Sequence, residues 1–164
     1  MMNTIVTLEA KHDVAGFDCG TPALNNWLQT MARQHQKRSI SQTYVLVDGG
    51  TSDRILGYHV LAIRAMTPNV ALPAAMAKRL PREVPGITLA RLAVTLVEQG
   101  KGYGEMLLVD AMMRVRAVAA GVGGYAVFVD AKDADAATFY RKYGFTSFAS
   151  EPLILFMPIA SMPA

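Results

Sequence analysis

Three glycines at alternate positions form the part of the sequence best suited to binding a ligand. Gly100, Gly102 and Gly104 follow Gln99 directly. Glycines let the backbone come close to a phosphate, and a helix that starts beside them points free N–H groups and a partial positive charge at it. Residues 99–104 therefore predict a site for a phosphate-bearing ligand.

Two common phosphate-binding motifs do not match this segment. The P-loop requires a Lys-Ser or Lys-Thr pair after its last glycine, and none is present. The dinucleotide fingerprint has the spacing G-x-G-x-x-G, whereas this chain has G-x-G-x-G. The pattern that fits is Q-x-x-G-x-G. The alternative is a glycine turn that only reverses the chain.

A second group of reactive side chains lies in residues 136–145, which read AATFYRKYGF. A tyrosine phenol has a pKa near 10, so at neutral pH it carries a proton that it can donate. Tyr140 is the first candidate for such a donor, and Tyr143 is the second because it falls on the same helical face. The alternative is that both belong to the core.

Charged and metal-binding residue types give weaker signals. Arg91 stands among apolar residues of an expected strand, which favours either contact with the acceptor or a phosphate, or a structural ion pair. The three histidines have no metal-ligand spacing. Cys19 is the only cysteine, so neither an internal disulfide nor a cysteine metal site can form. We expect no metal, and Cys19 as a small buried side chain in preference to a nucleophile.

Two basic groups could contact a nucleic-acid backbone, although a solvated helix face is the alternative. They contain Arg33, Lys37 and Arg38 in the first group, and Lys78, Arg79 and Arg82 in the second.

The elements that must position these residues follow from hydrophobic periodicity and from turn residues. The expected strands are 3–9, 44–48, 55–66, 87–95, 125–129, 145–149 and 152–157. The expected helices start at Thr21-Pro22, around 72–80, after the glycine turn, and at Asp133 as N-cap.

The long helix after the glycine turn should bury one face, and glycines should end it. The buried residues are expected to be Gly104, Leu107, Leu108, Ala111, Val115 and Val118, and the ending glycines are Gly121, Gly123 and Gly124. The order of elements predicts an α/β (α+β) fold, with a mixed sheet and flanking helices.

Bulk properties indicate one globular domain spanning residues 1–164. The chain is 52% hydrophobic and 18% charged, with a net charge of +3. The uncharged stretches at residues 117–129 and 152–164 are shorter than the ~18 residues that a spanning helix needs. The first residues lack the features of a secretory signal. These features favour a cytoplasmic protein without a membrane segment.

The two motifs together resemble the GNAT N-acetyltransferases, whose signatures are Q-x-x-G-x-G and A-x-x-F-Y-x-x-x-G-F. The resemblance implies a mostly antiparallel sheet in which strand 87–95 splays from strand 125–130, with acetyl-CoA between them. It implies Tyr140 as general acid and the Val94 amide as the group that holds the developing oxyanion. Implied contacts to acetyl-CoA are Leu92, Ala93, Val94, Gln99, Gly100, Lys101, Gly102, Tyr103, Gly104, Phe139 and Asp133, where many members have asparagine.

Segments along nearly the whole chain are similar to one GNAT subgroup, the toxins of type II toxin–antitoxin systems. The segments are residues 17–20 (FDCG), 24–28 (LNNWL), 42–46 (QTYVL), 89–94 (LARLAV), 100–104 (GKGYG) and 151–153 (EPL). The resemblance implies acetylation of the α-amino group of aminoacyl-tRNA, which blocks translation. It also implies a ribbon-helix-helix antitoxin, DNA binding only through that antitoxin, and a homodimer. Substrate contacts would come from Arg91, Arg33, Lys37, Arg38, Lys78 and Arg79.

Two other functions remain open at this point. The chain could acetylate a small amine or a protein N-terminus, or it could be an inactive binding module that acts with an antitoxin as a repressor. No general base stands out in the sequence. An α-amino group, with a pKa of about 7.7–8.0, is neutral in a useful fraction at pH 7, whereas a lysine amine near 10.4 is not. The missing base therefore favours an α-amine acceptor.

Overall fold

The computed structural model describes residues 3–49 and 53–163, which divide into two compact units. Unit 1 consists of Met1–Ala62 and Ala90–Ala111, and unit 2 of Ile63–Leu89 and Met112–Ala164. The strands β3 (Ile55–Pro68) and β4 (Glu83–Val94) and the helix α4 (Tyr103–Val122) each contribute residues to both units. A single domain spanning residues 1–164 stays a prediction.

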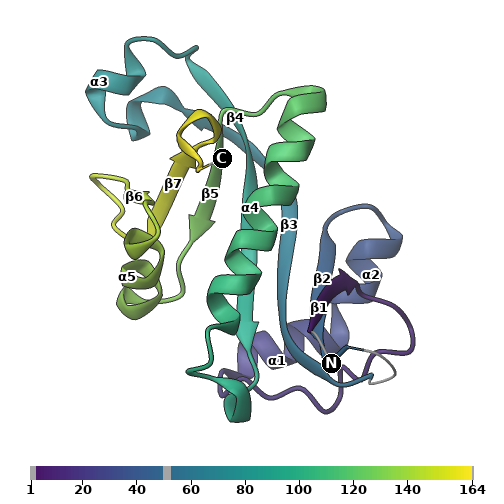
Figure 1. The fold of residues 1–164 in the computed structure, drawn as a ribbon. Coiled ribbons are helices and arrows are strands. Elements are labelled where there is room, and N and C mark those ends of the chain that lie inside the picture. Colours follow the sequence, from purple (N-terminus) through teal and green to yellow (C-terminus); the bar gives the residue numbers. More distant parts are fainter. Residues whose placement is uncertain (1–2, 50–52, 164) are drawn as a thin grey trace. The chain divides into compact units, whose positions relative to one another are not determined.

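Unit 1 is built on antiparallel pairing of β1 (Thr4–Thr7) with β2 (Gln42–Val47), and of β2 with the first part of β3. The helices α1 (Pro22–Thr30) and α2 (Ala32–Lys37) precede β2 in the chain, and α2 packs beside it (Figure 1). A short 3-10 turn at Leu96–Glu98 joins β4 to the glycine loop before α4.

Unit 2 contains a parallel pairing between β4 and β5 (Ala126–Asp130). β7 (Ile154–Pro158) pairs antiparallel with β5 and with β6 (Thr146–Ser147). The helix α5 (Ala134–Lys142) packs on β6 and β7 (Figure 1). The seven strands follow the order β1-β2-β3-β4-β5-β7-β6, so the expected mixed, mostly antiparallel sheet is confirmed.

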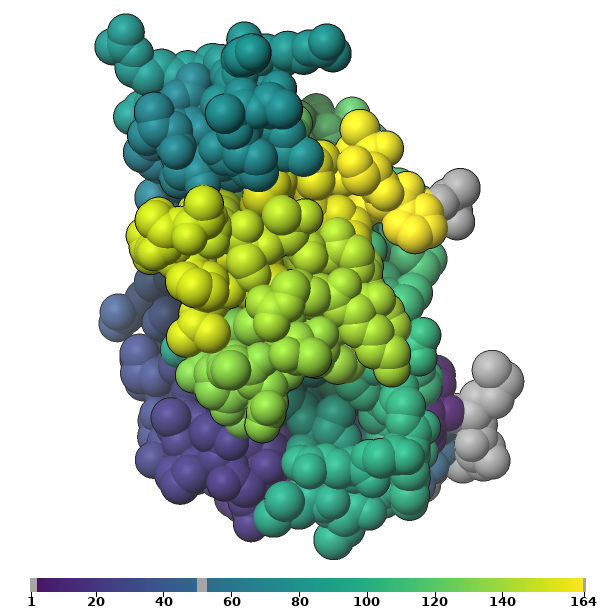
Figure 2. Space-filling view, turned by 90° about the vertical axis from the view of Figure 1, so that its left-hand side faces the viewer, coloured from purple at the N-terminus to yellow at the C-terminus, as the bar shows by residue number. Residues whose placement is uncertain are grey.

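Each unit has its own apolar core. In unit 1, Tyr58 and Val60 of β3 pack with Leu28 of α1, and Cys19 joins this cluster as a small buried side chain. In unit 2, Phe128 and Phe156 form the centre. The core of unit 2 extends to the segment around α3 (Ala74–Ala77), which a 3-10 turn at Asn69–Ala71 precedes. Another 3-10 turn, at Ile159–Ser161, follows β7. Figure 2 shows the α3 segment, in teal, at one end of this unit.

Some expectations at the helices were wrong. The helix expected to start at Thr21-Pro22 is interrupted, because α1 ends at Thr30 and α2 starts at Ala32, and Met31 between them is exposed. Val118 is 49% exposed, although Leu107, Leu108, Ala111 and Val115 are buried as expected. Gly121 lies inside α4, and Gly123, with φ of 90°, is the residue that follows its end.

No helix in the described residues is both long enough and apolar enough to cross a membrane.

Candidate active site

Two glycines with positive φ shape the loop between β4 and α4. Gly100 has a φ of 82° and Gly102 a φ of 85°, a region that other residues rarely adopt. A Cβ on either glycine would meet no atom within 4 Å. The backbone conformation, and not a lack of space, therefore calls for glycine. The open space above both residues is available to a ligand.

The loop and the first turn of α4 present a row of backbone amides. Across the described chain, the N–H groups of residues 100–105 have no hydrogen-bond acceptor, and the next amide, that of Met106, donates to the Gly102 carbonyl at 3.2 Å. Unpaired N–H groups at a helix start carry partial positive charge and bind phosphate oxygens. This arrangement fits a diphosphate, as in acetyl-CoA.

Gln99 ties the loop to its surroundings. Its Nε2 donates to the Val94 carbonyl at 2.9 Å and to the Cys19 carbonyl at 3.1 Å. Its backbone N–H donates to the Leu96 carbonyl at 3.2 Å. Because the side-chain nitrogen is used twice in this way, Gln99 shapes the loop that carries the free amides.

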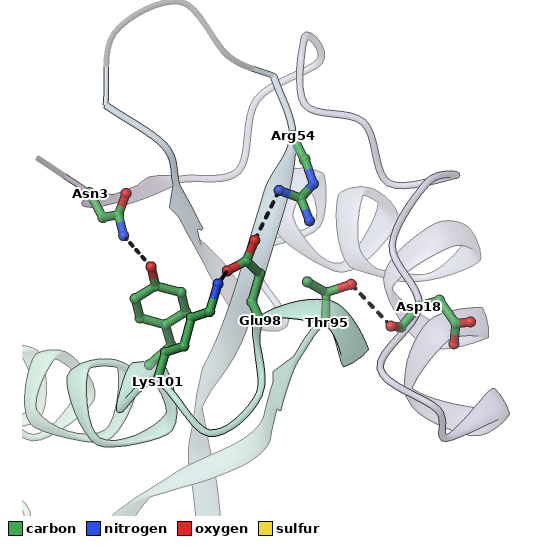
Figure 3. A network of polar contacts seen from close by, with 7 residues as sticks. Asn3, Asp18, Arg54, Thr95, Glu98 and Lys101 are labelled. Atoms are coloured by element: carbon green, nitrogen blue, oxygen red, sulfur yellow. Dashed lines mark hydrogen bonds and ion pairs between the residues drawn. The ribbon is translucent and has the colours of Figure 1, made fainter. Parts of the chain in front are cut away.

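The segment around Asp18 braces the other side of the loop. The Asp18 carbonyl accepts hydrogen bonds from Thr95 Oγ1 at 3.0 Å and from the Leu96 amide at 2.8 Å (Figure 3). The Asp18 carboxylate accepts from the Gly20 amide and from Asn25 Nδ2, both at 2.9 Å, and these bonds lower the pKa of Asp18. The FDCG segment is therefore a structural support for the loop.

Glu98 lies between two cations just before the first glycine. Its carboxylate accepts from Lys101 Nζ at 2.7 Å and from Arg54 Nη1 at 3.2 Å (Figure 3). The hydrogen bond from Lys101 is the main reason that the pKa of Glu98 is lowered, and Glu98 in turn raises the pKa of Lys101. Glu98 is thus held as a paired anion, which argues against a role as general base.

The first residue of α4 is held from the N-terminal segment. Asn3 Nδ2 donates to the Tyr103 hydroxyl at 3.0 Å (Figure 3). This contact fixes the ring of Tyr103 beside the loop.

Tyr140 lies on α5 in unit 2 and is 6% exposed. Its ring meets Phe139 and Phe145 edge to face, with centroid distances of 5.3 and 5.6 Å. Burial raises the pKa of Tyr140, which keeps the phenol protonated. Its hydroxyl makes no hydrogen bond to any described residue. The ring is therefore fixed while its proton stays available to a ligand.

The neighbours of Tyr140 have structural contacts of their own. Phe139 is half-buried, and its ring lies 5.0 Å from that of Tyr143. The Asp133 carboxylate accepts from the Ala136 amide at 2.8 Å and caps α5, as expected.

No protein-family model matches the sequence, but curated and solved proteins do. The chain is 32% identical to a tRNA-acetylating toxin of Mycobacterium tuberculosis over 145 residues, which is 88% of this chain and 85% of the relative. The chain belongs to the family of tRNA-acetylating GNAT toxins. The expected family and the acetyltransferase activity are thereby confirmed.

Solved toxin structures agree with this assignment. A tyrosine-to-phenylalanine mutant of KacT superposes with a TM-score of 0.92 at 34% identity, over 98% of this chain and 97% of the other. AtaT complexed with acetyl-methionyl-tRNAfMet gives 0.90 at 33% identity, over 98% and 96%. Other neighbours are AtaTR bound with AcCoA, an AtaT mutant bound to the C-terminus of the antitoxin AtaR, and a KacTA–DNA complex.

In this GNAT toxin, the end of β4 is divided between two cores. Leu92 and Val94 pack with Leu107 of α4, whereas Ala93 is buried in the cluster of α1 and β3. Gly57 of β3 allows this close packing, because a Cβ there would lie 2.8 Å from the Ala93 carbonyl oxygen.

Arg91 is held by an aromatic ring and not by a carboxylate. Its guanidinium lies over the Trp27 ring at 4.5 Å, and its Nε is buried without a hydrogen-bond partner. It forms no ion pair within the described ranges. The expectation of a structural ion pair was wrong, because the aromatic face of α1 takes the place of the carboxylate.

The basic residues differ in their surroundings. Arg33 Nη2 donates to the carbonyls of Glu9, Ala10 and His12 at 2.8–3.2 Å. Arg33 therefore supports the segment of residues 9–12 that follows β1. The other basic residues expected at a substrate surface, Lys37 and Arg38 in unit 1 and Lys78 and Arg79 in unit 2, are exposed. Among the described residues, no three His, Cys, Asp or Glu side chains come together as a metal site.

Sequence reasoning missed the supports of the loop. Asn3, Asp18 and Arg54 are far from residues 99–104 in the chain, and only the fold brings them beside that segment. The one available signal was the spacing of Asp18 and Gly20 just before α1, which is typical of local side-chain to backbone hydrogen bonds.

Proposed function

We propose that this protein transfers the acetyl group of acetyl-CoA to the α-amino group of an aminoacyl-tRNA and so blocks translation, as a type II toxin. The observation that carries the proposal is the row of unpaired amides at residues 100–105, placed directly after β4 in a chain of the tRNA-acetylating family. AtaT has been solved with acetylated methionyl-tRNA, which supports this acceptor class.

When bound, acetyl-CoA supplies the acetyl group as a thioester. The amides of Gly100, Lys101, Gly102, Tyr103 and Gly104 hold its pyrophosphate, and Gln99 shapes the loop that carries them. The backbone of Leu92, Ala93 and Val94 holds the pantetheine arm, with the Val94 amide stabilising negative charge on the thioester oxygen. Phe139 supports the ring of the acid, and Asp133 acts as helix cap.

Tyr140 acts as the general acid. The amine attacks the carbonyl carbon, the carbon–sulfur bond breaks, and the phenol proton of Tyr140 passes to the leaving thiolate. The nitrogen gives up its surplus proton to solvent, and the phenolate of Tyr140 is then reprotonated. KacT and AtaT have both been studied as tyrosine-to-phenylalanine mutants, which supports a tyrosine in this role.

The exposed residues Lys37, Arg38, Lys78 and Arg79 contact tRNA phosphates. Arg33 stays in this proposed surface as a half-buried member, with its Nη2 already donating to the carbonyls of Glu9 and His12. Arg91, held over Trp27, is kept as a contact to the acceptor because its Nε has no partner.

The partners extend this function. An antitoxin of the ribbon-helix-helix class neutralises the toxin and carries it to DNA, and two copies of the toxin form a homodimer. The complexes of AtaT with AtaR and of KacTA with DNA support the antitoxin and DNA parts. The single unpaired cysteine and the tRNA acceptor support a cytoplasmic location.

The test is acetyl transfer from radiolabelled acetyl-CoA to total charged tRNA, beside the Tyr140→Phe variant. We expect label on tRNA that mild ester hydrolysis releases, and none with the variant. Absence of label from tRNA in a protein that still binds acetyl-CoA would reject the tRNA acceptor, and a small amine or a protein N-terminus would take its place.

A further inference from the structure

A charged cluster in unit 2 lies at the carboxyl end of the parallel strand pair. β4 and β5 are registered from Gly86↔Ala126 to Leu89↔Val129, and Asp130 is the next residue of β5. In sheets with parallel strands, ligands bind beyond the carboxyl ends of the strands. Asp130 ends its strand in the same unit as Tyr140, which lies ten residues further along the chain.

Arg64 of β3 holds the carboxylate of Asp130 from two sides. Nη1 donates to Oδ2 at 3.3 Å, and Nη2 donates to Oδ1 at 3.2 Å. A two-point contact of this kind fixes the plane of the carboxylate, which a single contact from lysine cannot do.

Arg64 is itself fixed by the sheet. Its Nη1 also donates to Thr88 Oγ1 at 3.3 Å, and its guanidinium lies 4.9 Å from the centre of the Phe128 ring. Thr88 Oγ1 in turn donates to the Phe128 carbonyl at 3.3 Å. Two strands thus position one arginine, whose only ion-pair partner in the described residues is Asp130.

The two members of the pair differ in exposure. The side chain of Arg64 is 17% exposed, whereas that of Asp130 is 61% exposed. A carboxylate can accept about four hydrogen bonds, and Arg64 uses two of these positions. The pair therefore presents an oriented carboxylate to solvent, with its cation held behind it.

We propose that Asp130, oriented by Arg64, binds the α-amino group of the aminoacyl ester and so lets the enzyme distinguish charged from uncharged tRNA. This inference rests on the proposed function. Asp130 touches the substrate, and Arg64 is a positioning residue.

The ion pair suits a nucleophilic amine better than a lone carboxylate does. An isolated anion beside an amine favours its charged form, which cannot attack the thioester. The charge of Arg64 offsets that of Asp130, so the carboxylate can accept an N–H hydrogen bond while the nitrogen keeps its lone pair. An uncharged tRNA ends in hydroxyl groups and lacks this amine.

The test measures the affinity of the protein, without acetyl-CoA, for total charged tRNA and for the same tRNA after mild alkaline deacylation. We expect wild type to bind the charged pool roughly tenfold more tightly, the range of a hydrogen bond to a charged group. Asp130→Ala should remove this preference, and Asp130→Asn, whose amide oxygen can still accept one N–H, should weaken it. Both variants should leave the affinity for deacylated tRNA unchanged. Arg64→Gln should weaken the preference for charged tRNA. Arg64→Lys should weaken it less than Arg64→Gln does.

The matched control is Glu83→Ala, in the same unit. This change removes an exposed carboxylate at the first residue of β4, whereas Asp130 lies at the last residue of β5. It should keep the tenfold preference. A preference that survives Asp130→Ala and Asp130→Asn, or an equal loss of affinity for both pools, overturns the inference. Radiolabelled acetyl transfer by wild type separates the two failures. If wild type labels tRNA but the Asp130 variants keep the preference for charged tRNA, only the role of Asp130 is rejected. If wild type does not label tRNA, the proposed function is rejected as well.

Discussion

At the scale of the residue, we expect the hydroxyl of Tyr140 to be needed for catalysis but not for folding. Tyr140→Phe removes one oxygen from a ring that stays packed between Phe139 and Phe145. General acids contribute about 10²- to 10⁴-fold, so we expect kcat for acetyl transfer to fall by that range. The melting temperature and the affinity for acetyl-CoA should stay close to those of wild type, as measured by thermal unfolding and calorimetry.

Tyr143→Phe is the matched control for that substitution. Tyr143 follows α5 directly and is half-buried beside Phe139, but it lacks the full burial of Tyr140. Its variant should retain most of the activity. A greater loss with Tyr143→Phe than with Tyr140→Phe would move the acid to Tyr143.

The burial of Tyr140 also sets the pH dependence of the reaction. Because its pKa is raised above the ordinary value near 10, the acid stays protonated throughout the range in which charged tRNA can be assayed. The acceptor α-amine loses its proton around pH 8. We expect kcat/KM to rise to about pH 8 and to stay level to about pH 9.5, measured as initial rates. A decline between these values would contradict a buried acid.

At the scale of the element, the glycine loop should tolerate no side chain at its left-handed positions. Gly102→Ala places a Cβ at a φ of 85°, which costs about 1–2 kcal/mol of unfolding free energy if the conformation is kept. Relaxation of the loop would instead turn the amides of residues 100–105 away from the pyrophosphate. We expect an affinity for acetyl-CoA at least several-fold weaker, measured by calorimetry.

Gly121→Ala provides the opposite case, inside the helix α4 that follows the loop. Gly121 is helical, has no positive φ, and a Cβ there would meet no atom within 4 Å. Alanine should therefore stabilise α4 by about 0.5–1 kcal/mol, measured by denaturant unfolding, and leave the affinity for acetyl-CoA unchanged. Equal effects of Gly102→Ala and Gly121→Ala on the affinity for acetyl-CoA would show that this affinity does not depend on the backbone conformation of the glycine loop.

The ion pairs of Glu98 make a contribution to stability that depends on pH. Lys101 and Arg54 lower the pKa of Glu98 in the folded state. The contribution is therefore complete above the unfolded pKa and is lost as the pH falls through the folded one. Glu98→Gln should lower the melting temperature at pH 7, and the difference from wild type should shrink progressively as the pH falls below the ordinary glutamate pKa of about 4.3. A difference that persists undiminished at pH 3 would assign the effect to packing.

Local signals in the sequence predicted most elements but not the ends of helices or the supports of the site. Proline and glycine marked the turns, so α1, α4 and α5 begin within two residues of their expected starts. The apolar period of α4 continues to Val118, but burial depends on what covers the helix, and periodicity does not contain that information. The loop motif and Tyr140 were visible as local patterns. The contact of Glu98 with Arg54 was not, because 44 residues separate them.

At the scale of the whole molecule, a net charge of +3 is small for an enzyme that acts on tRNA, so the placement of exposed cations should matter more than their number. Lys37→Glu and Lys78→Glu each reverse one such charge, in unit 1 and unit 2 respectively. If each lysine contacts a phosphate, each variant should raise KM for charged tRNA and reduce the slope of log KM against log salt by about one.

Lys11→Glu changes the net charge by the same amount at an exposed lysine outside both basic groups. Long-range attraction depends on total charge, whereas release of counterions depends on direct phosphate contacts. A direct tRNA surface therefore predicts a reduced salt slope for Lys37→Glu and Lys78→Glu and an unchanged slope for Lys11→Glu. The same small rise of KM in all three variants, with no change of slope, would mean that only the net charge attracts tRNA and that its phosphates bind elsewhere.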